Sequence, residues 1–182
     1  MTQIAEPPVT PLISESALAD RVRVLGEQIQ KDYANRELVI VSVLKGSFLF
    51  AADLVRAIDL PMRIEFFGVR SYGAATVSSG EVQITLDLTR PITGADVLVI
   101  EDIVDTGLTL TYILEQLRAR GPRSVSVCAL LHKPSRSVKP VPIDYLGFTI
   151  EDVFVVGYGL DYAERHRNLP YVGVLDQPPK KP

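Results

Sequence analysis

The sequence predicts an α/β protein with a mainly parallel, twisted sheet flanked by helices. Short runs of β-branched and leucine residues alternate with segments whose apolar residues recur at helical spacing. Such alternation is typical of strands joined by crossover helices, and strands joined in this way run parallel. The chain has 182 residues, about the size of one domain, and it contains no internal repeat or linker that would divide it.

The N-terminal part predicts a helix and a strand, followed by a second helix and strand. Prolines at 7, 8 and 11 predict an irregular start, after which Ser14 can cap the first helix. The apolar face of that helix consists of Leu18, Val22, Leu25, Ile29 and Tyr33. A buried strand over 38–44, a helix over 48–58 and a strand over 63–69 complete this part.

The later elements are shorter. Residues 71–80 are small and weakly apolar, which indicates a mobile loop that we interpret as a lid, and a strand over 82–88 follows it. Residues 97–100 form a buried strand, and Leu110, Ile113, Leu114 and Leu117 mark a helix. Residues 124–130 predict a buried strand. Beyond Leu130 we expect irregular chain with short strands at 153–156 and 172–175, and a disordered tail over 177–182.

Composition excludes several classes of protein. The net charge is −3 and the pI is near 5.4, so nothing favours strong non-specific binding to nucleic acid. No stretch approaches the roughly 20 apolar residues needed to cross a bilayer, and the first 11 residues lack the pattern of a signal peptide. Cys128 is the only cysteine, so an intrachain disulfide is impossible and a buried thiol is expected. We therefore expect a cytoplasmic protein.

The most informative segment is residues 97–109, in which a buried strand leads into three carboxylates and a small turn. Ligands gather at the carboxyl ends of strands in open α/β sheets. The backbone N–H groups of residues 106–109, with the hydroxyls of Thr106 and Thr109, would form a phosphate cup at the start of the next helix, and Gly107 permits close approach. The segment thus predicts a site for a phosphorylated sugar.

Charge suggests what the three carboxylates do. Because a phosphate cup disfavours negative neighbours, Glu101 and Asp102 are expected to face sugar hydroxyls or a divalent cation, while Asp105 points beyond the sugar. The simpler alternative is a helix cap at Asp105 and a solvated strand end. An aspartic-protease turn also contains Asp-Thr-Gly, but it needs a second matching carboxylate and a β-rich frame.

A second turn of similar construction follows residues 38–44. There a buried strand runs into Lys45, Gly46 and Ser47, and a helix begins directly afterwards. Free N–H groups and a cation at this edge could hold pyrophosphate. The alternative is an ordinary strand-to-helix turn with Lys45 in solvent.

Residues 97–109 resemble the phosphoribosyl-pyrophosphate (PRPP) signature of type I phosphoribosyltransferases. Four further segments appear in the order of the bacterial hypoxanthine (hypoxanthine-guanine) phosphoribosyltransferases, namely 44–47, 71–72, 133–136 and 154–162 with Arg167. The resemblance covers residues 12–176. It implies the type I phosphoribosyltransferase fold in a single domain, with a small hood formed by the N-terminal segment and residues 133–176.

The resemblance also implies roles for individual residues. The PRPP site would consist of Glu101, Asp102, Asp105, Thr106, Gly107, Leu108 and Thr109, and the pyrophosphate site of Lys45, Gly46 and Arg167, with a cis Leu44–Lys45 peptide. The purine site would place Lys133 at O6, Phe154 against the ring, Val155 at the base edge through its backbone, Asp161 beside the base and Asp105 at N7. Glu101, Asp102 and Asp161 would hold Mg²⁺, and the lid would carry Ser71 and Tyr72. Without the resemblance, Lys133 would be interpreted as a solvated lysine and Phe154 as a core aromatic.

The implied reaction displaces pyrophosphate from C1 of PRPP by N9 of hypoxanthine or guanine, giving IMP or GMP. Asp105 would act as the general acid and base. There are two alternatives, namely a PRPP-sensing regulator that binds nucleic acid and a transferase for xanthine or adenine. Adenine would not suit Lys133, because its 6-amino group is itself a donor. Leu108 stands where some relatives have lysine. The family also implies a homodimer or homotetramer.

Overall fold

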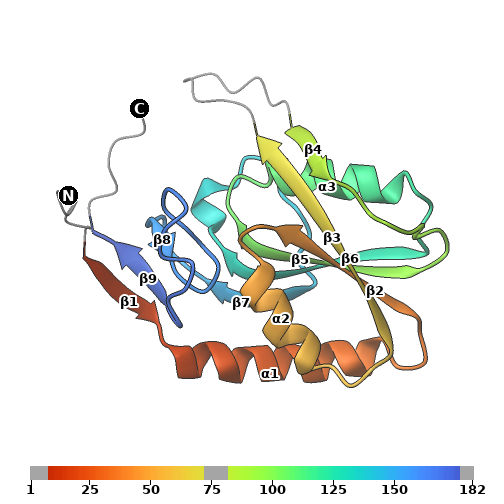
Figure 1. Cartoon of the computed structure of the whole chain (residues 1–182), viewed down its shortest axis with the longest axis horizontal. Coiled ribbons are helices and arrows are strands. Elements are labelled where there is room, and N and C mark those ends of the chain that lie inside the picture. Colours follow the sequence, from red (N-terminus) through yellow and green to blue (C-terminus); the bar gives the residue numbers. More distant parts are fainter. Residues whose placement is uncertain (1–7, 72–81, 177–182) are drawn as a thin grey trace.

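A six-stranded sheet in the order β4-β3-β2-β5-β6-β7 forms the centre of the molecule (Figure 1). The computed structural model describes residues 8–71 and 82–176. The strands are β2 (Leu38–Leu44), β3 (Met62–Ser71), β4 (Val82–Leu86), β5 (Asp96–Val104), β6 (Ser124–His132) and β7 (Tyr145–Thr149). All neighbours pair in parallel except β3 and β4, which are antiparallel. The predicted α/β class with a mainly parallel sheet is confirmed.

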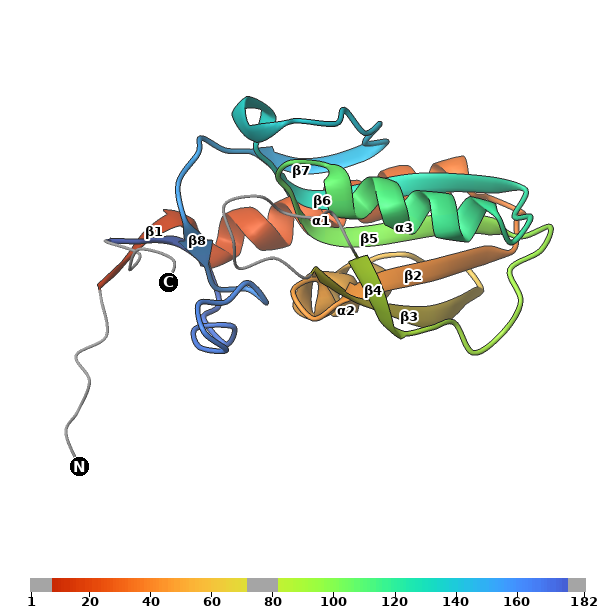
Figure 2. The same ribbon diagram turned by 90° about the horizontal axis from the view of Figure 1, so that it is seen from above.

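Helices cover both faces of this sheet. Helices α1 (Glu15–Asp32) and α2 (Phe48–Arg56) pack on one face, and α3 (Leu108–Arg118) packs on the other (Figure 2). The predicted cap of α1 is confirmed, because the Ser14 hydroxyl oxygen accepts a hydrogen bond from the Ala17 N–H at 3.2 Å. Within the described residues, none of the helices has the length and apolar character needed to cross a membrane.

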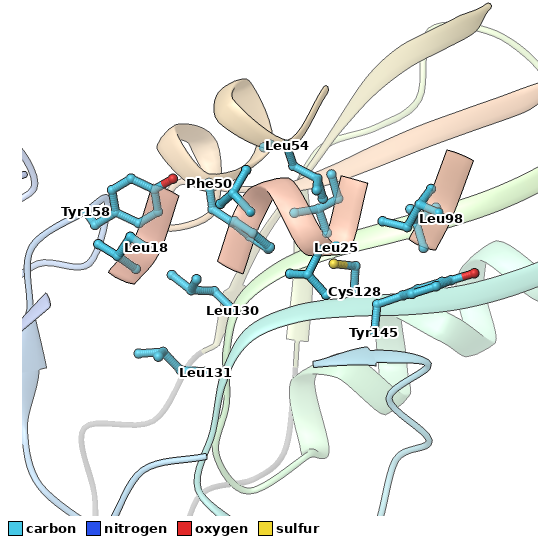
Figure 3. Close-up of a cluster of buried hydrophobic side chains, with 14 of the residues drawn as sticks. Leu18, Leu25, Phe50, Leu54, Leu98, Cys128, Leu130, Leu131, Tyr145 and Tyr158 are labelled. Carbon is cyan, nitrogen blue, oxygen red and sulfur yellow. The ribbon is translucent and has the colours of Figure 1, made fainter. Parts of the chain in front are cut away.

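Alternating side chains of the central strands build two separate cores. In β2, Leu38 and Ile40 pack towards α1 and α2, while Val39 and Val41 pack towards α3. Figure 3 shows the first of these cores, which includes Cys128 and residues from both helices. Cys128 is fully buried as predicted, and this burial raises the pKa of its thiol.

A second, smaller sheet lies beside the first. It consists of β1 (Val9–Ile13), β9 (Val172–Leu175) and β8 (Val155–Val156), in that order and antiparallel. The prediction of an irregular start at residue 11 was therefore wrong for β1. Pro11 is compatible with the strand because β1 lies at the sheet edge, next to a register shift between Pro11 and Ile13.

Strand β7 was also missed, since residues after Leu130 were expected to be irregular. A glycine interrupts its apolar pattern, yet a Cβ at Gly147 would overlap the backbone oxygen of Leu130 on the neighbouring strand. The close approach of the two strands therefore requires glycine, and glycine in turn weakens the sequence pattern by which β7 could have been predicted.

Element ends differ by a few residues elsewhere. α2 ends at Arg56 and not at Ile58, β4 ends at Leu86 and not at Leu88, β6 continues to His132, and β8 covers only the last two residues of the predicted 153–156. The predicted lid beyond Ser71 and the predicted tail over 177–182 fall outside the described residues.

Candidate active site

The site lies where the direction of the chain across the sheet reverses. After β2 the chain crosses to β3 on one side, whereas after β5 it crosses to β6 on the other. Helices therefore diverge from this point, and the crevice at the carboxyl ends of β2 and β5 is open to ligands. The two turns singled out in the sequence, at Lys45–Ser47 and Asp105–Gly107, both lie there.

The turn after β5 starts later than the sequence suggested. Glu101 and Asp102 lie within β5, which continues to Val104, so only Asp105 extends beyond the strand. The N-cap position of α3 is occupied by Gly107 in left-handed conformation, with φ 79°, which excludes Asp105 as the helix cap. A Cβ at Gly107 would also overlap the backbone oxygen of Lys139. The turn encloses a cavity of about 140 Å³ that is lined by Glu101–Gly107, Thr109 and Leu110.

Glu101 and Asp102 have unusual surroundings for carboxylates. Glu101 is 8 % exposed, and its Oε2 atom has no hydrogen-bond partner within the described part of the chain. Burial, with a smaller effect of the neighbouring Asp102 charge, raises the pKa of Glu101 well above its usual value. Burial likewise raises the pKa of Asp102 to about 6, although the Ile103 N–H donates to Asp102 Oδ1 at 2.9 Å. The pair is therefore suited to hydroxyl groups or to a cation that would favour its charged form.

The turn after β2 lies directly against Asp102. The Leu44–Lys45 peptide bond is cis, as the resemblance implied. A Cβ at Gly46 would overlap Asp102 Oδ2, and a Cβ at Gly159, where φ is 101°, would overlap the Gly46 carbonyl oxygen. These glycines allow three segments that are distant in sequence to meet at one point.

Cations and carboxylates alternate around this meeting point. Arg167 Nη2 lies 2.8 Å from Asp161 Oδ1 and 3.3 Å from Glu164 Oε1, and Lys45 Nζ lies 3.0 Å from Glu164 Oε2. Lys45, expected as an available cation, is thus paired with a residue that sequence reasoning missed. The surrounding cavity measures about 430 Å³ and includes Leu44–Gly46, Gly68–Arg70, Thr85, Leu86, Asp102, Asp161, Glu164 and Arg167 in its wall.

A third cavity, of about 330 Å³, lies between β5 and the loops after β6. Its wall contains Ile103, Asp105, Lys133, Arg136, Asp152, Phe154, Val155, Leu160 and Asp161. Lys133 is only 7 % exposed, so it is no solvated lysine. Phe154 is 36 % exposed and packs edge-on against Tyr162, with ring centroids 5.8 Å apart, so it is no core aromatic.

Two charged residues of this third cavity were not assigned any role from the sequence. Arg136 Nε donates a hydrogen bond to Asp105 Oδ1 at 3.1 Å, and Arg136 Nη1 lies 3.6 Å from Asp152 Oδ2. Asp152 Oδ1 in turn lies 3.8 Å from Lys133 Nζ. The three-residue spacing of Lys133 and Arg136 was the signal that could have identified Arg136; nothing in the sequence marks Asp152.

The three cavities are joined pairwise by carboxylates. Asp102 borders the cavity at the turn after β2 and the cavity at the turn after β5. Asp105 borders the cavity after β5 and the third cavity, and Asp161 borders the cavity after β2 and the third cavity. Within the described residues, no three His, Cys, Asp or Glu side chains gather as a ready metal site. Asp102 and Asp161 nevertheless share one cavity, which suits a cation that keeps waters and takes further oxygens from its substrate.

The structure brings together the predicted residues from distant parts of the chain. Those that line the three cavities are Lys45, Gly46, Glu101, Asp102, Asp105, Thr106, Gly107, Thr109, Lys133, Phe154, Val155, Asp161 and Arg167. The side chain of Leu108 is exposed on the first turn of α3, away from these walls. Tyr72 and the side chain of Ser71 fall outside the description.

Comparisons with known proteins agree with this arrangement. The family model "Phosphoribosyl transferase domain" matches residues 12–163. The chain is 48 % identical over 164 residues to the hypoxanthine-guanine phosphoribosyltransferase of Bacillus subtilis, with 90 % of this chain and 91 % of that protein covered. It is 50 % identical over 165 residues to the hypoxanthine phosphoribosyltransferase of Haemophilus influenzae, covering 89 % and 92 %. A crystal structure of a hypoxanthine phosphoribosyltransferase from Staphylococcus aureus superposes with a TM-score of 0.88 at 46 % identity, covering 91 % and 90 % of the two chains.

Proposed function

The chain belongs to the phosphoribosyltransferase family, and from this we propose that it is a purine salvage enzyme that transfers the 5-phosphoribosyl group of PRPP to hypoxanthine or guanine. The bond from C1 of ribose to pyrophosphate breaks, and a bond from C1 to N9 of the base forms. The products are pyrophosphate and IMP or GMP. Direct displacement at C1 requires no covalent enzyme intermediate.

The observation that carries this proposal is the meeting of three cavities at Asp102, Asp105 and Asp161. PRPP and a base together have three parts that radiate from ribose, namely the 5-phosphate, the pyrophosphate and the base. C1 would lie where the cavities join, and it gains positive character as pyrophosphate departs. Fixed carboxylates around that point would stabilise the developing charge.

The pyrophosphate would occupy the cavity beside Lys45, Gly46 and Arg167. Lys45 supplies an ammonium group and Arg167 a planar fork of donors, both of which suit a departing anion. The 5-phosphate would bind in the cup formed by residues 106–109, with backbone N–H groups and the hydroxyls of Thr106 and Thr109.

The base would occupy the third cavity. Lys133 can donate to O6 of a 6-oxopurine, Phe154 presents an accessible ring face, and Val155 offers backbone groups at the same wall. Asp105 would accept the proton of N7 while N9 forms its bond to C1. A 6-amino purine would present a donor to Lys133, so adenine is expected to be a poor substrate.

The acidic residues also fit a magnesium ion brought with PRPP. Asp102 and Asp161 would contact it directly or through water, and Glu101 would support the ribose side. When bound, the ion would neutralise charge on the pyrophosphate leaving group. Hydrogen bonds to the ribose hydroxyls remain the task of the carboxylates themselves.

We further propose that the small sheet is the hood, since Phe154 lies beside β8, and Asp161 and Arg167 lie between β8 and β9.

The resemblance also leads us to expect a homo-oligomer. Ile64 and Phe66 point to one face of β3 and are each 45 % exposed, so this apolar surface is a candidate contact between subunits. Sedimentation would detect the assembly, and Phe66→Ser should weaken it. The cytoplasmic location stays a prediction.

The experiment that tests the function measures pyrophosphate release from PRPP and Mg²⁺ with hypoxanthine, guanine, xanthine and adenine in separate reactions. We expect turnover with hypoxanthine or guanine and little with adenine. Turnover with xanthine alone would move the assignment to another base. Binding of PRPP without turnover on any base would favour a PRPP-sensing regulator.

A further inference from the structure

A short helical turn after β6 places two cations on one side of the chain. The 3₁₀ turn η1 covers Pro134–Arg136, with Lys133 at its N-cap, and the Arg136 N–H donates to the Lys133 carbonyl oxygen at 3.1 Å. Lys133 directly precedes this turn, and both it and Arg136 line the same cavity, although only Lys133 has an expected contact with the base.

Arg136 contacts the carboxylate that is expected to receive the proton of the base. Its Nε donates to Asp105 Oδ1 at 3.1 Å, while its Nη1 lies 3.6 Å from Asp152 Oδ2. The nearby Asp105 and Asp152 charges raise the pKa of the Arg136 guanidinium, with Asp105 the larger influence. Arg136 is therefore held between two carboxylates, of which only Asp105 has a part in the proposed reaction.

Backbone hydrogen bonds fix the loop of Arg136 on both sides of Asp105. The Lys133 N–H donates to the Val104 carbonyl oxygen at 3.0 Å, and the N–H groups of Val138 and Lys139 donate to the Thr106 carbonyl oxygen at 3.1 and 3.0 Å. These contacts precede and follow Asp105 in the sequence. The main chain thus holds the loop of Arg136 next to Asp105, so that their side chains are within reach of one another.

We propose that Arg136 is the positioning residue of Asp105, an inference that rests on the proposed transferase function. By holding Oδ1, Arg136 turns Oδ2 of the same carboxylate towards N7 of the 6-oxopurine. The N7–H bond breaks and an O–H bond forms on Oδ2, while the electron pair left on the ring supports the new bond from N9 to C1. Arg136 keeps its own protons throughout.

A double-mutant cycle tests this role. Arg136→Gln removes the charge and the planar fork, and we expect it to lower kcat about tenfold while KM for PRPP changes less than about twofold. Arg136→Lys, which keeps the charge, should recover part of kcat. In an Asp105→Asn background, Arg136→Gln should cost less than about twofold, because the amide no longer accepts the proton that Arg136 helps to direct.

Arg23→Gln is the matched control, since Arg23 forms an exposed ion pair with Glu27 at 2.8 Å on α1, far from the three cavities. It should leave kcat unchanged. An equal loss from Arg136→Gln in both backgrounds, or a rise in KM for PRPP at constant kcat, would overturn the positioning role. These results require turnover by the wild-type chain. Absence of turnover in the wild-type chain would refute the transferase function itself, and this result differs from failure of the positioning role in an active enzyme.

Discussion

The carboxylates of Glu101 and Asp102 on β5 and that of Asp105 in the turn occupy different environments. Glu101 and Asp102 are held against the sheet edge, where burial raises the pKa of each. Asp105 is 39 % exposed at its side chain and is paired with Arg136. Under the proposed function this difference separates two tasks within one short segment: Glu101, which is buried, and Asp102, which is half-buried, would bind ribose or a cation, and Asp105 would handle a proton.

The largest effect is expected from Asp105→Asn, which removes the carboxylate of the turn and leaves Glu101 and Asp102 in place. We expect kcat to fall by about 10²–10⁴, the range typical of a lost general acid or base, with little change in KM for PRPP. Steady-state kinetics with hypoxanthine would measure both constants. Asp102→Asn serves as the comparison, since it should raise KM for PRPP as well as lower kcat. If Asp105→Asn left kcat unchanged, the two carboxylate environments would not correspond to two tasks.

Gly46→Ala tests the buried side of the comparison. A Cβ at this position would overlap Asp102 Oδ2, so the carboxylate must move away from the β2 turn. Displacements of about 1 Å can cost about 100-fold in rate, and we expect kcat/KM for PRPP to fall roughly 10- to 100-fold. The KM for hypoxanthine should change little, and a thermal melt would confirm that the variant is folded. An equal loss of affinity for base and PRPP would contradict a local effect.

Much of the large sheet could be predicted because its physical signals are local. The run at 38–44 is buried on both faces and therefore reads as continuously apolar, and the helical face of α1 follows from spacing alone. In the small sheet β9 and the end of β8 were predicted as short strands, but β1 and the pairing of the three strands were not. β1 contains Pro11, and β8 has two residues, so their pairing depends on contacts with β9 that only the folded chain provides.

The site shows the same division. Residues 101–109 are predictable because strand, carboxylates and turn follow one another directly in the sequence. Glu164 and Asp152 are not, since an isolated acidic residue in a polar loop is ordinary until the fold places it beside Lys45 or Lys133. Arg136 lies between these cases, because its spacing from Lys133 is visible but its contact with Asp105 is not.

A smaller effect is expected in the stability of the free protein. The pKa of Asp102 is about 6 in the folded chain, above the roughly 3.9 of an unfolded aspartate, so the folded state binds the proton more tightly. Its contribution therefore favours folding as the pH falls through 6 and opposes folding at neutral pH. Asp102→Asn should stabilise the protein by on the order of 1–3 kcal/mol at pH 7.5, and by roughly half as much at pH 5. Urea unfolding at both pH values would measure the difference, and a gain independent of pH would contradict the buried charge as its cause.

The smallest predicted effect concerns Glu164, whose carboxylate forms ion pairs with Lys45 and Arg167, the two cations expected to bind pyrophosphate. Its ion pairs with Lys45 and Arg167 must be exchanged for contacts with the ligand. Glu164→Gln should therefore bind pyrophosphate more tightly, by about two- to fivefold, because the ligand no longer displaces a carboxylate and exposed ion pairs of this kind are weak. Calorimetric titration with magnesium pyrophosphate would measure this, with Glu27→Gln on α1 as the control. Weaker binding by Glu164→Gln would contradict this expectation. It would mean that Glu164 holds Lys45 and Arg167 in the positions that the ligand needs, and does not compete with the ligand for them.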